Sequence, residues 1–579
     1  MTPKILLDVL APMRDGIELS CDVYLPLEGD SFPVLLCRTL YSKESNPETD
    51  GARPIGYVGW AMDFVEAGYA VVIQDVRGRY DSEGDWEVYV QDEDGYDTIE
   101  WIATQPWCDG NVGMFGISYV GFTQMHPAPL ASEHLKGILP IAATPDGFDL
   151  FWQQGAFLLQ QASHFLQIGR RTSHPIGMAI LAGLPAGTTG IGGGKAGAPA
   201  GDLSYLYERM PMLSAFEEFD DVFVWKEFLT HQTKDEYWRR RIVTDRYETI
   251  TTPAYFLTGW WDCTVHHMFD AFTNWRRSAS EEAAARTKIM VGPWTHTRIG
   301  VPDWGQDVEF GDSAQLDIVG HHFHWYDRRL KGSATGVDEE APLQLYVCGD
   351  NEWRGEYEWP LARTEYRVMY LSSGGSANTR SGDGLLTFEQ REDGRPDRYV
   401  YDPENPVPTL GGHVAYVDRS GPRDRAHLED RGDILVYSTH VLDEDLECTG
   451  PITTVVYASS SAVDTDFTAT LIDVFPDGKA INVTEGIVRA RARNAGEPDT
   501  LIEPGVIYEY GIDLWEASWV FKAGHRLRLE ISSSNFPRFD RNTNLGGTIG
   551  EESEMTPAEQ TVYHDEKHAS RLVLPVIPR

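Results

Sequence analysis

The first third of the chain alternates short apolar runs, rich in β-branched residues, with segments of helical periodicity. Short apolar runs bounded by turns predict strands, and apolar residues three or four positions apart predict a helix with one buried face. Because parallel strands need a crossover connection, this alternation favours a mostly parallel sheet covered by helices. The expected strands are residues 17–25, 33–41, 69–75, 111–116 and 135–143, and the expected helices are 92–104 and 119–130.

The alternation breaks off between residues 147 and 247. Aromatic and helical stretches there surround a tract rich in Gly and Ala, 187–201, which predicts a loop. The pattern resumes with strands at 253–259 and 288–292 and a helix at 265–278. A helical insertion between the strands of such a sheet is a candidate cap over an active site.

Beyond an expected linker at 330–342, strand-like runs separated by Gly, Pro and Asp turns replace the helices. This texture is typical of an all-β sandwich or jelly roll. The expected strands there are 343–347, 366–371, 434–441, 453–458, 467–475 and 525–532. We therefore predict an α/β domain in two parts, 1–146 and 248–337, a helical cap at 147–247 and a jelly-roll domain at 338–579.

Charge and cysteine content exclude several classes of protein. With 49 basic and 89 acidic residues the net charge is −40, which excludes nucleic acid as a partner and argues against an anionic membrane surface. The six cysteines lie far apart and form no zinc or redox motif. No apolar run approaches the length of about 20 residues that spans a membrane, and residues 1–12 lack the pattern of a signal peptide. We expect a cytoplasmic protein.

The sharpest local motif is Gly116-Ile-Ser118-Tyr119-Val-Gly121, between an expected strand and an expected helix. This is the context in which a tight turn lifts a serine hydroxyl out of a sheet as a nucleophile. The motif departs from strict G-x-S-x-G because its last glycine comes one residue late. An ordinary turn at the end of a strand is the alternative interpretation.

An acid and a histidine follow in the order that this fold requires. Asp262 comes after the strand 253–259, and His296 after the strand 288–292. Both are therefore expected on the sheet edge that carries Ser118, the edge where open α/β sheets bind ligands. Their structural alternatives are a helix N-cap for Asp262 and a hydrogen-bonded loop histidine for His296.

The three residues predict an acyl-enzyme mechanism. His296 would remove the proton of Ser118, and Asp262 would orient and stabilise the imidazolium. The oxyanion needs donors, for which we expect the backbone N–H of Tyr119 and the hydroxyl of Tyr41, after the strand 33–41. Tyr41 alternatively packs as an aromatic residue at a strand end.

These residues belong to a set of motifs that resembles the cocaine-esterase-type (CocE/NonD) acyl esterases, relatives of the Xaa-Pro dipeptidyl-peptidases and the glutaryl-cephalosporin acylases. The other matching stretches are Asp75-Val-Arg-Gly-Arg-Tyr-Asp-Ser-Glu-Gly84, Asp94-Gly-Tyr-Asp97, Gln105-Pro-Trp-Cys-Asp-Gly110, Gly259-Trp-Trp-Asp262, Gly292-Pro-Trp-Thr-His296, Gly349-Asp-Asn-Glu-Trp-Arg354, Ser459–Phe467 and Glu530–Arg541. The resemblance covers nearly the whole chain. It implies an α/β-hydrolase domain with an inserted cap and a C-terminal jelly roll, the triad Ser118, Asp262 and His296, and an oxyanion hole of Tyr41 and the Tyr119 amide.

The expected substrate is a neutral carboxylic ester, with amides as an extension. The related α-amino-acid ester hydrolases carry extra carboxylates just after the catalytic acid, where this chain has Cys263, Thr264 and Val265. An Xaa-Pro dipeptidyl-peptidase and a cephalosporin or glutaryl acylase are the enzymatic alternatives. The negative charge disfavours the glutaryl group unless an arginine lines the pocket. Candidate pocket residues, each of which also fits a core position, are Phe151, Trp152, Phe157, Phe165, Trp260 and Trp261.

A lectin-like binding protein on an inactive hydrolase scaffold is the non-enzymatic alternative. We expect no cofactor and no metal, because the cluster His321, His322 and His324 puts only two of its imidazoles on one helix face. The β domain offers surface for contacts in a possible homo-oligomer.

Overall fold

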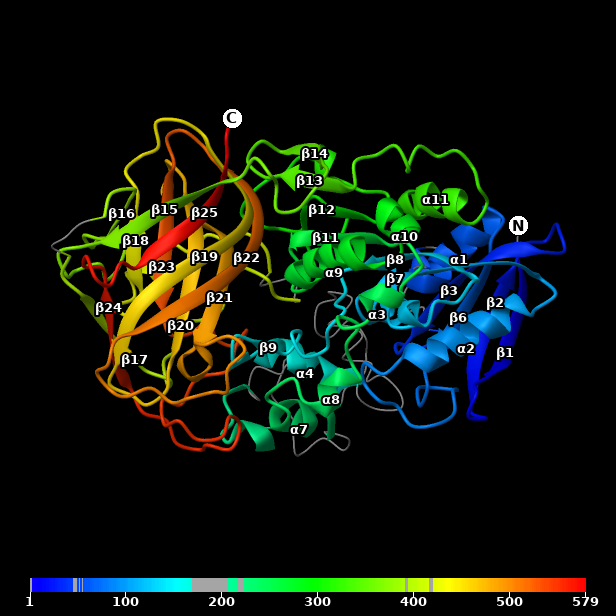
Figure 1. Ribbon diagram of the computed structural model, residues 1–579, viewed down its shortest axis with the longest axis horizontal. Coiled ribbons are helices and arrows are strands. Elements are labelled where there is room, and N and C mark those ends of the chain that lie inside the picture. Colours follow the sequence, from blue (N-terminus) through cyan, green and yellow to red (C-terminus); the bar gives the residue numbers. More distant parts are fainter. Residues whose placement is uncertain are drawn as a thin grey trace.

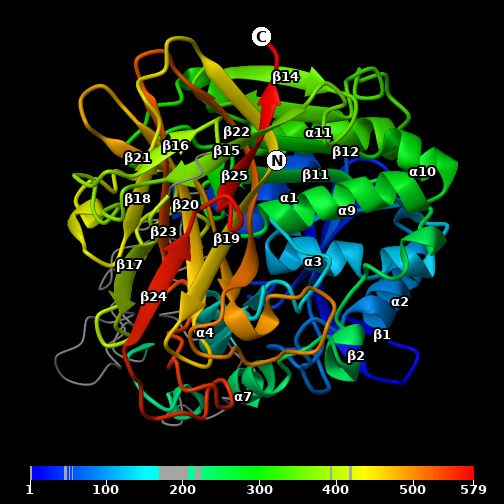
Figure 2. The same cartoon turned by 60° about the vertical axis from the view of Figure 1, so that its left-hand side comes forward.

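The computed structural model describes residues 3–44, 49–50, 53–54, 56–168, 207–215, 223–390, 394–415 and 420–579. Two large sheets stand side by side, and the cap helices lie beneath the junction between them (Figure 1). A view turned by 60° shows the same layers with the C-terminal sheet forward (Figure 2). The expected loop 187–201 lies outside the described residues.

The first sheet has ten strands in the order β1-β2-β6-β3-β7-β8-β11-β12-β13-β14. The seven strands from β6 to β13 in this order are parallel, and β1, β2 and β14 add antiparallel edges. Their bounds are β1 Lys4–Pro12, β2 Glu18–Leu25, β3 Phe32–Thr39, β6 Ala70–Asp75, β7 Cys108–Ile117, β8 Leu135–Ile141, β11 Tyr255–Trp261, β12 Lys288–Thr295, β13 Leu343–Val347 and β14 Glu352–Glu356.

Helices cover both faces of this sheet, which is why its central strands are apolar without alternation. Along β3, Val34 and Leu36 point to one face and Leu35 and Cys37 to the other, and all four are buried. Residues of α1 and α11 pack on the Leu35 face, and residues of α2 and α9 pack on the Val34 face. The helices of this domain are α1 Gly56–Glu66, α2 Asp92–Ala103, α3 Tyr119–Met125, α9 Val265–Ser278, α10 Glu281–Arg286 and α11 Ile318–Arg329.

The described part of the inserted segment combines helices with two short strands. It contains α4 Leu159–Ile168, α7 Phe223–Thr230 and α8 Glu236–Arg239, besides the short strands β9 Trp152–Gln153 and β10 Ala156–Phe157. Several of its residues hydrogen bond to the C-terminal domain, Gln154 and Phe157 among them. The amide of Phe157 donates to Asp540 and its carbonyl accepts from the Asp540 amide, while the Gln154 side chain bonds the backbone of Gly511 and Asp513.

The second sheet is antiparallel except for the pairing of β16 with β18. Ten of its strands follow the order β17-β24-β19-β25-β15-β16-β18-β23-β20-β21, and β22 pairs with β19 off this path. The bounds are β15 Glu365–Ser372, β16 Leu385–Thr387, β17 Asp397–Tyr401, β18 Leu435–Ser438, β19 Leu446–Ser460, β20 Asp466–Val474, β21 Ala480–Arg489, β22 Tyr508–Phe521, β23 Arg526–Ser532, β24 Ala558–Tyr563 and β25 Arg571–Ile577.

Two of the differences from the sequence-based expectation concern the domain border and the site. The run 343–347 was expected in the all-β part, but as β13 it pairs in parallel with β12 and extends the first sheet past the predicted border at residue 337. This pairing depends on a neighbour about 50 residues earlier in the chain and leaves no local sequence signal. In addition, β11 and β12 continue to Trp261 and Thr295, so Asp262 and His296 directly follow their strands.

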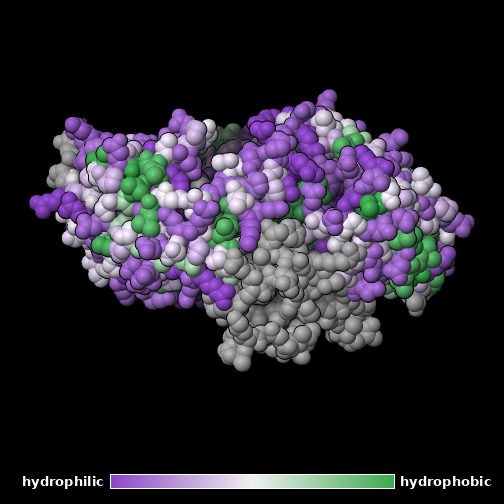
Figure 3. All heavy atoms as spheres, turned by 90° about the horizontal axis from the view of Figure 1, so that it is seen from below, coloured by the Kyte–Doolittle hydropathy of each residue, from purple (hydrophilic) through white to green (hydrophobic). Residues whose placement is uncertain are grey.

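The surface agrees with the charge of the chain. The face seen from below is mainly hydrophilic, with small, separated apolar patches among its coloured residues (Figure 3). In the described part of the chain, every helix is too short or too polar to cross a membrane.

Candidate active site

Ser118 occupies a strained turn between β7, which ends at Ile117, and α3, which begins at Tyr119. Its backbone has φ 61° and ψ −124°, a conformation that non-glycine residues seldom adopt. The turn is held because the Ser118 amide donates to the Ile141 carbonyl at 2.8 Å and the Ser118 carbonyl accepts from Gly121 and Phe122. The hydroxyl is thereby presented above the carboxyl ends of the parallel strands.

Two glycines make this turn possible, and they explain the late second glycine of the motif. Gly116 has φ 139°, and a Cβ there would lie 2.2 Å from Cγ1 of Val120. A Cβ on Gly121 would lie 2.7 Å from the Cβ of Ala143, beyond the end of β8. The second glycine therefore lets α3 approach the neighbouring strand closely.

We expect Gly116→Ala to destabilise the protein by about 1–3 kcal/mol, because the new Cβ needs both a strained φ and a shift of Val120. Chemical denaturation followed by circular dichroism measures the change. Gly432→Ala is the matched control, since a Cβ at Gly432 meets nothing within 4 Å. Equal stability of the two variants would contradict this account of the turn.

Ser118, His296 and Asp262 form one continuous chain of hydrogen bonds. The Ser118 hydroxyl lies 2.9 Å from Nε2 of His296, and Nδ1 of His296 lies 2.9 Å from Oδ1 of Asp262. With the ring proton on Nδ1, this nitrogen donates to the carboxylate and leaves Nε2 to accept the serine proton. The structure thus brings together three residues that lie on three separate strand ends.

The carboxylate of Asp262 is buried and hydrogen bonded through both oxygens. It accepts hydrogen bonds from the amide and hydroxyl of Thr264 at 2.9 and 3.0 Å, and from the hydroxyl of Thr258 at 3.0 Å. Burial alone would raise its pKa, but His296 and these donors keep the pKa of Asp262 below its ordinary value. Asp262 therefore stays ionised and can stabilise a positive charge on the imidazole.

The imidazole of His296 responds to the same neighbours. Burial lowers its pKa, whereas the adjacent Cys263 and the Asp262 carboxylate raise it, and the net pKa lies well above the ordinary histidine value. The ring is thus poised to hold a proton taken from a hydroxyl group.

Tyr41 lies just beyond β3, at the sheet edge that carries Ser118. Burial raises the pKa of Tyr41 to about 12, although the neighbouring Ser118 hydroxyl lowers it. The phenol therefore keeps its proton at neutral pH and remains a donor. Tyr119 begins α3, where backbone N–H groups have no partner within the helix.

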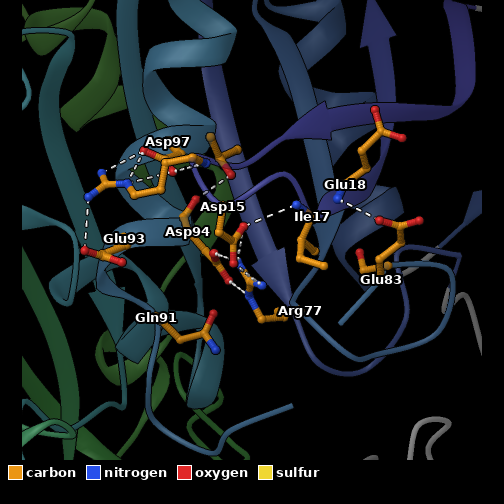
Figure 4. Close-up of polar contacts among 12 residues, drawn as sticks. Asp15, Ile17, Glu18, Arg77, Glu83, Gln91, Glu93, Asp94 and Asp97 are labelled. Atoms are coloured by element: carbon orange, nitrogen blue, oxygen red, sulfur yellow. Dashed lines mark hydrogen bonds and ion pairs between the residues drawn. The ribbon is translucent and has the colours of Figure 1, made fainter. Parts of the chain in front are cut away.

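The position of Tyr41 is fixed by a residue of the stretch Asp75–Gly84, for which the sequence predicts no role. Arg79 is fully buried and donates to the carbonyl of Leu40 from both Nε and Nη2, at 3.0 and 2.9 Å. Arg77, two residues earlier, instead joins Asp15 and Asp94 near the surface (Figure 4). The stretch therefore ties the loop after β3 to the rest of the domain, directly beside the site.

We expect Arg79→Met to lower kcat by about tenfold to a hundredfold with a smaller change in KM, because Tyr41 loses the anchor of its backbone. Steady-state kinetics on a nitrophenyl ester measure both constants. Arg77→Met is the matched control: it removes an arginine of the same stretch without touching Leu40, so its kcat should stay near that of the parent. Equal losses in both variants would assign the effect to the stretch as a whole.

The aromatic residues of the cap share a core with the site. Phe151, Trp152 and Phe157 are buried in one cluster that also contains Tyr119 and, at its edge, Tyr41. Phe151 stacks on Phe228 at 4.0 Å. The side chain of Phe165 lies outside the described residues.

The two tryptophans before Asp262 point into different surroundings. Trp260 donates to the Tyr346 carbonyl and stacks on Phe269 of α9. Trp261 is buried against Phe310 and Trp519, at the contact with the C-terminal domain. These contacts agree with core positions, and the role of both residues in a pocket stays a prediction.

Cys263 also lies beside Asp262 and His296. This neighbour of the imidazole was not predicted from the sequence. It is buried, and its sulfur lies within 4.8 Å of a ring nitrogen of His296. Its position directly after Asp262 was the available signal, but the contact with His296 is made through space.

The fold and this chain of hydrogen bonds define the chain as an α/β serine hydrolase. Residues 15–298 match the family model of the X-Pro dipeptidyl-peptidases (S15 family), and residues 335–573 match that of the X-Pro dipeptidyl-peptidase C-terminal non-catalytic domain. A cocaine esterase from Rhodococcus sp. (strain MB1 Bresler) is 38% identical over 99% of this chain and 98% of its own length. The chain therefore belongs to the cocaine-esterase-type (CocE/NonD) family of serine hydrolases, as the motifs indicated.

Solved structures share the whole fold. An aminopeptidase from a marine sediment archaeon (Thaumarchaeota archaeon) superposes with a TM-score of 0.84 at 22% identity, covering 100% of this chain and 97% of its own. An α-amino acid ester hydrolase gives a TM-score of 0.81 at 23% identity, covering 99% and 97%. At these identities the likeness concerns the fold alone.

Proposed function

We propose that the protein hydrolyses carboxylic esters through an acyl-enzyme formed on Ser118. The observation that most strongly supports this proposal is the unbroken chain of hydrogen bonds from the Ser118 hydroxyl through His296 to the buried Asp262. We call this chain the relay. The relation to a cocaine esterase over the full chain favours an ester as the substrate. This function also speaks against the lectin-like alternative, which has no use for the relay.

In the proposed reaction His296 takes the proton of Ser118 while the oxygen attacks the ester carbonyl. The tetrahedral oxyanion is stabilised by the phenol of Tyr41 and the amide of Tyr119. His296 then gives the proton to the departing alcohol, and the acyl group remains on Ser118. A water molecule activated by His296 releases the acid in the second half of the cycle.

The residues after the catalytic acid bear on the choice of substrate. Cys263, Thr264 and Val265 give no carboxylate to hold a substrate ammonium group, and the Thr264 side chain is already engaged with Asp262. We propose a neutral acyl group on this ground. Release of Xaa-Pro dipeptides is the second candidate, favoured by the S15 family match and testable with the same variants.

We further propose that the second sheet is a jelly roll and that the cap comprises residues 147–247. The fastening of Gln154 and Phe157 to the C-terminal domain supports a shared pocket between cap and sheet. All six cysteines are unpaired thiols, which fits the reducing conditions of a cytoplasm. Homo-oligomer contacts through the β domain stay a prediction.

We expect Ser118→Ala to abolish hydrolysis of a nitrophenyl ester and labelling by a fluorophosphonate, because both need the serine oxygen. The parent enzyme should cleave the ester and leave an Xaa-Pro anilide nearly untouched. Thr297→Ser, a conservative change at a nearby hydroxyl residue, controls for general damage. Turnover of the ester by Ser118→Ala would refute the assignment, and preference for the anilide would support the dipeptidyl-peptidase.

We expect kcat/KM to rise with pH through the pKa of His296, because only the neutral imidazole accepts a proton. The midpoint of the acidic limb of kcat/KM should lie above the ordinary histidine pKa of about 6.5. Asp262→Asn removes a carboxylate that raises this pKa, so its residual activity should show a limb at lower pH. The test is to measure kcat/KM against pH for the parent and for Asp262→Asn. Acidic limbs at the same pH in both enzymes would contradict the coupling between Asp262 and His296.

A further inference from the structure

Cys263 adds a third type of ligand to the buried pair of Asp262 and His296. One nitrogen of His296, the sulfur of Cys263 and one carboxylate oxygen of Asp262 lie within 4.8 Å of one another. All three side chains are buried, so water is largely excluded from the space between them. The three groups therefore converge on one small volume beside the catalytic serine.

This donor set suits one class of ion. Thiolate, imidazole and carboxylate together are typical ligands of zinc, at distances of about 2.0–2.3 Å. The edges of such a ligand triangle measure about 3.5 Å, so groups within 4.8 Å, among them His296 Nδ1 and Asp262 Oδ1 at 2.9 Å, need only small shifts to share an ion. Magnesium and calcium prefer oxygen ligands throughout and gain little from the sulfur.

The charge around the thiol permits a cation. Arg538 is the basic residue whose field reaches Cys263, and its guanidinium is paired with the buried carboxylate of Glu485. The Asp262 carboxylate accepts hydrogen bonds from Thr258 and Thr264, which stabilise its ionised form. A divalent ion that replaces the proton of the thiol therefore meets two negative ligands and one neutral imidazole.

An ion at this place takes the base out of the relay. If the metal binds Nδ1, the single ring proton must sit on Nε2, which then faces Ser118 as a donor and cannot accept its proton. If the metal binds Nε2, it occupies the lone pair that the serine needs. Either geometry leaves Ser118 without a base.

We propose that Cys263, His296 and Asp262 form an inhibitory site for a thiophilic divalent cation such as Zn²⁺ or Cd²⁺. On binding, the sulfur–metal bond replaces the S–H bond and the thiol proton passes to the solvent, so no oxidant or further reactant is needed. The ion is a reversible inhibitor and not a cofactor. Its inhibitory effect rests on the proposed function, whereas its binding does not.

The first test measures hydrolysis of a nitrophenyl ester in rising ZnCl₂, with MgCl₂ as the comparison ion. The parent should lose activity with Zn²⁺, recover it with a chelator and be indifferent to Mg²⁺. Cys263→Ala should need at least about tenfold more Zn²⁺ for half inhibition, because even indirect partners of a metal site change affinity by about tenfold to a hundredfold. Cys108→Ser is the matched control, since Cys108 is a half-buried thiol on β7 that the site does not use. Equal sensitivity of Cys263→Ala and the parent would overturn the proposal.

The second test reads binding without activity. Cd²⁺ is titrated into Ser118→Ala and into Ser118→Ala/Cys263→Ala, and the ultraviolet charge-transfer band of a cadmium thiolate is recorded. We expect one equivalent of this band in the first protein and its loss in the second. The band without ester hydrolysis in the parent would retain the site and reject the proposed function. Absence of a Cys263-dependent band would reject the site, whatever the parent hydrolyses.

Discussion

The hydrogen bond between the Asp262 carboxylate and Nδ1 of His296 is the contact on which the remaining site depends. It sets the tautomer of the imidazole, and the tautomer decides whether Nε2 can accept a proton from Ser118. A buried carboxylate is stable only when its oxygens are bonded, and Thr258 and Thr264 supply those bonds. The fold must therefore build a polar cluster inside a hydrophobic sheet edge before any chemistry is available.

The parallel sheet solves this problem of placement. β7, β11 and β12 all end at one edge, so the residue that follows each strand arrives beside the other two. Tyr41 follows β3 at the same edge, and the buried Arg79 fixes its position through the Leu40 carbonyl. Strand order therefore places the relay and Tyr41 at one edge, and Arg79 stabilises the backbone beside Tyr41.

Strand order also explains which parts of the site could be predicted from the sequence. Ser118, Asp262 and His296 were predictable because each directly follows a strand with a clear apolar pattern, and strand order alone puts them together. The role of Arg79 was not predictable, because it acts on a backbone carbonyl 39 positions away. The pairing of β13 with β12 and the contact of Cys263 with His296 likewise arise only from tertiary packing. The aromatic residues predicted for the pocket are an intermediate case. The sequence could predict that they are buried, but not which of them would contact a substrate.

The position of β25 has a consequence for how the molecule is made. This strand, Arg571–Ile577, lies inside the second sheet between β15 and β19, not at an edge. The sheet cannot close during synthesis until the ribosome has released these residues, long after the relay residues have emerged. The cap is hydrogen bonded to this domain near Asp540. The cap therefore lacks its partner surface until the second sheet has formed. A ribosome that stalls before β25 would leave a polypeptide that contains Ser118, Asp262 and His296 but not a completed second sheet.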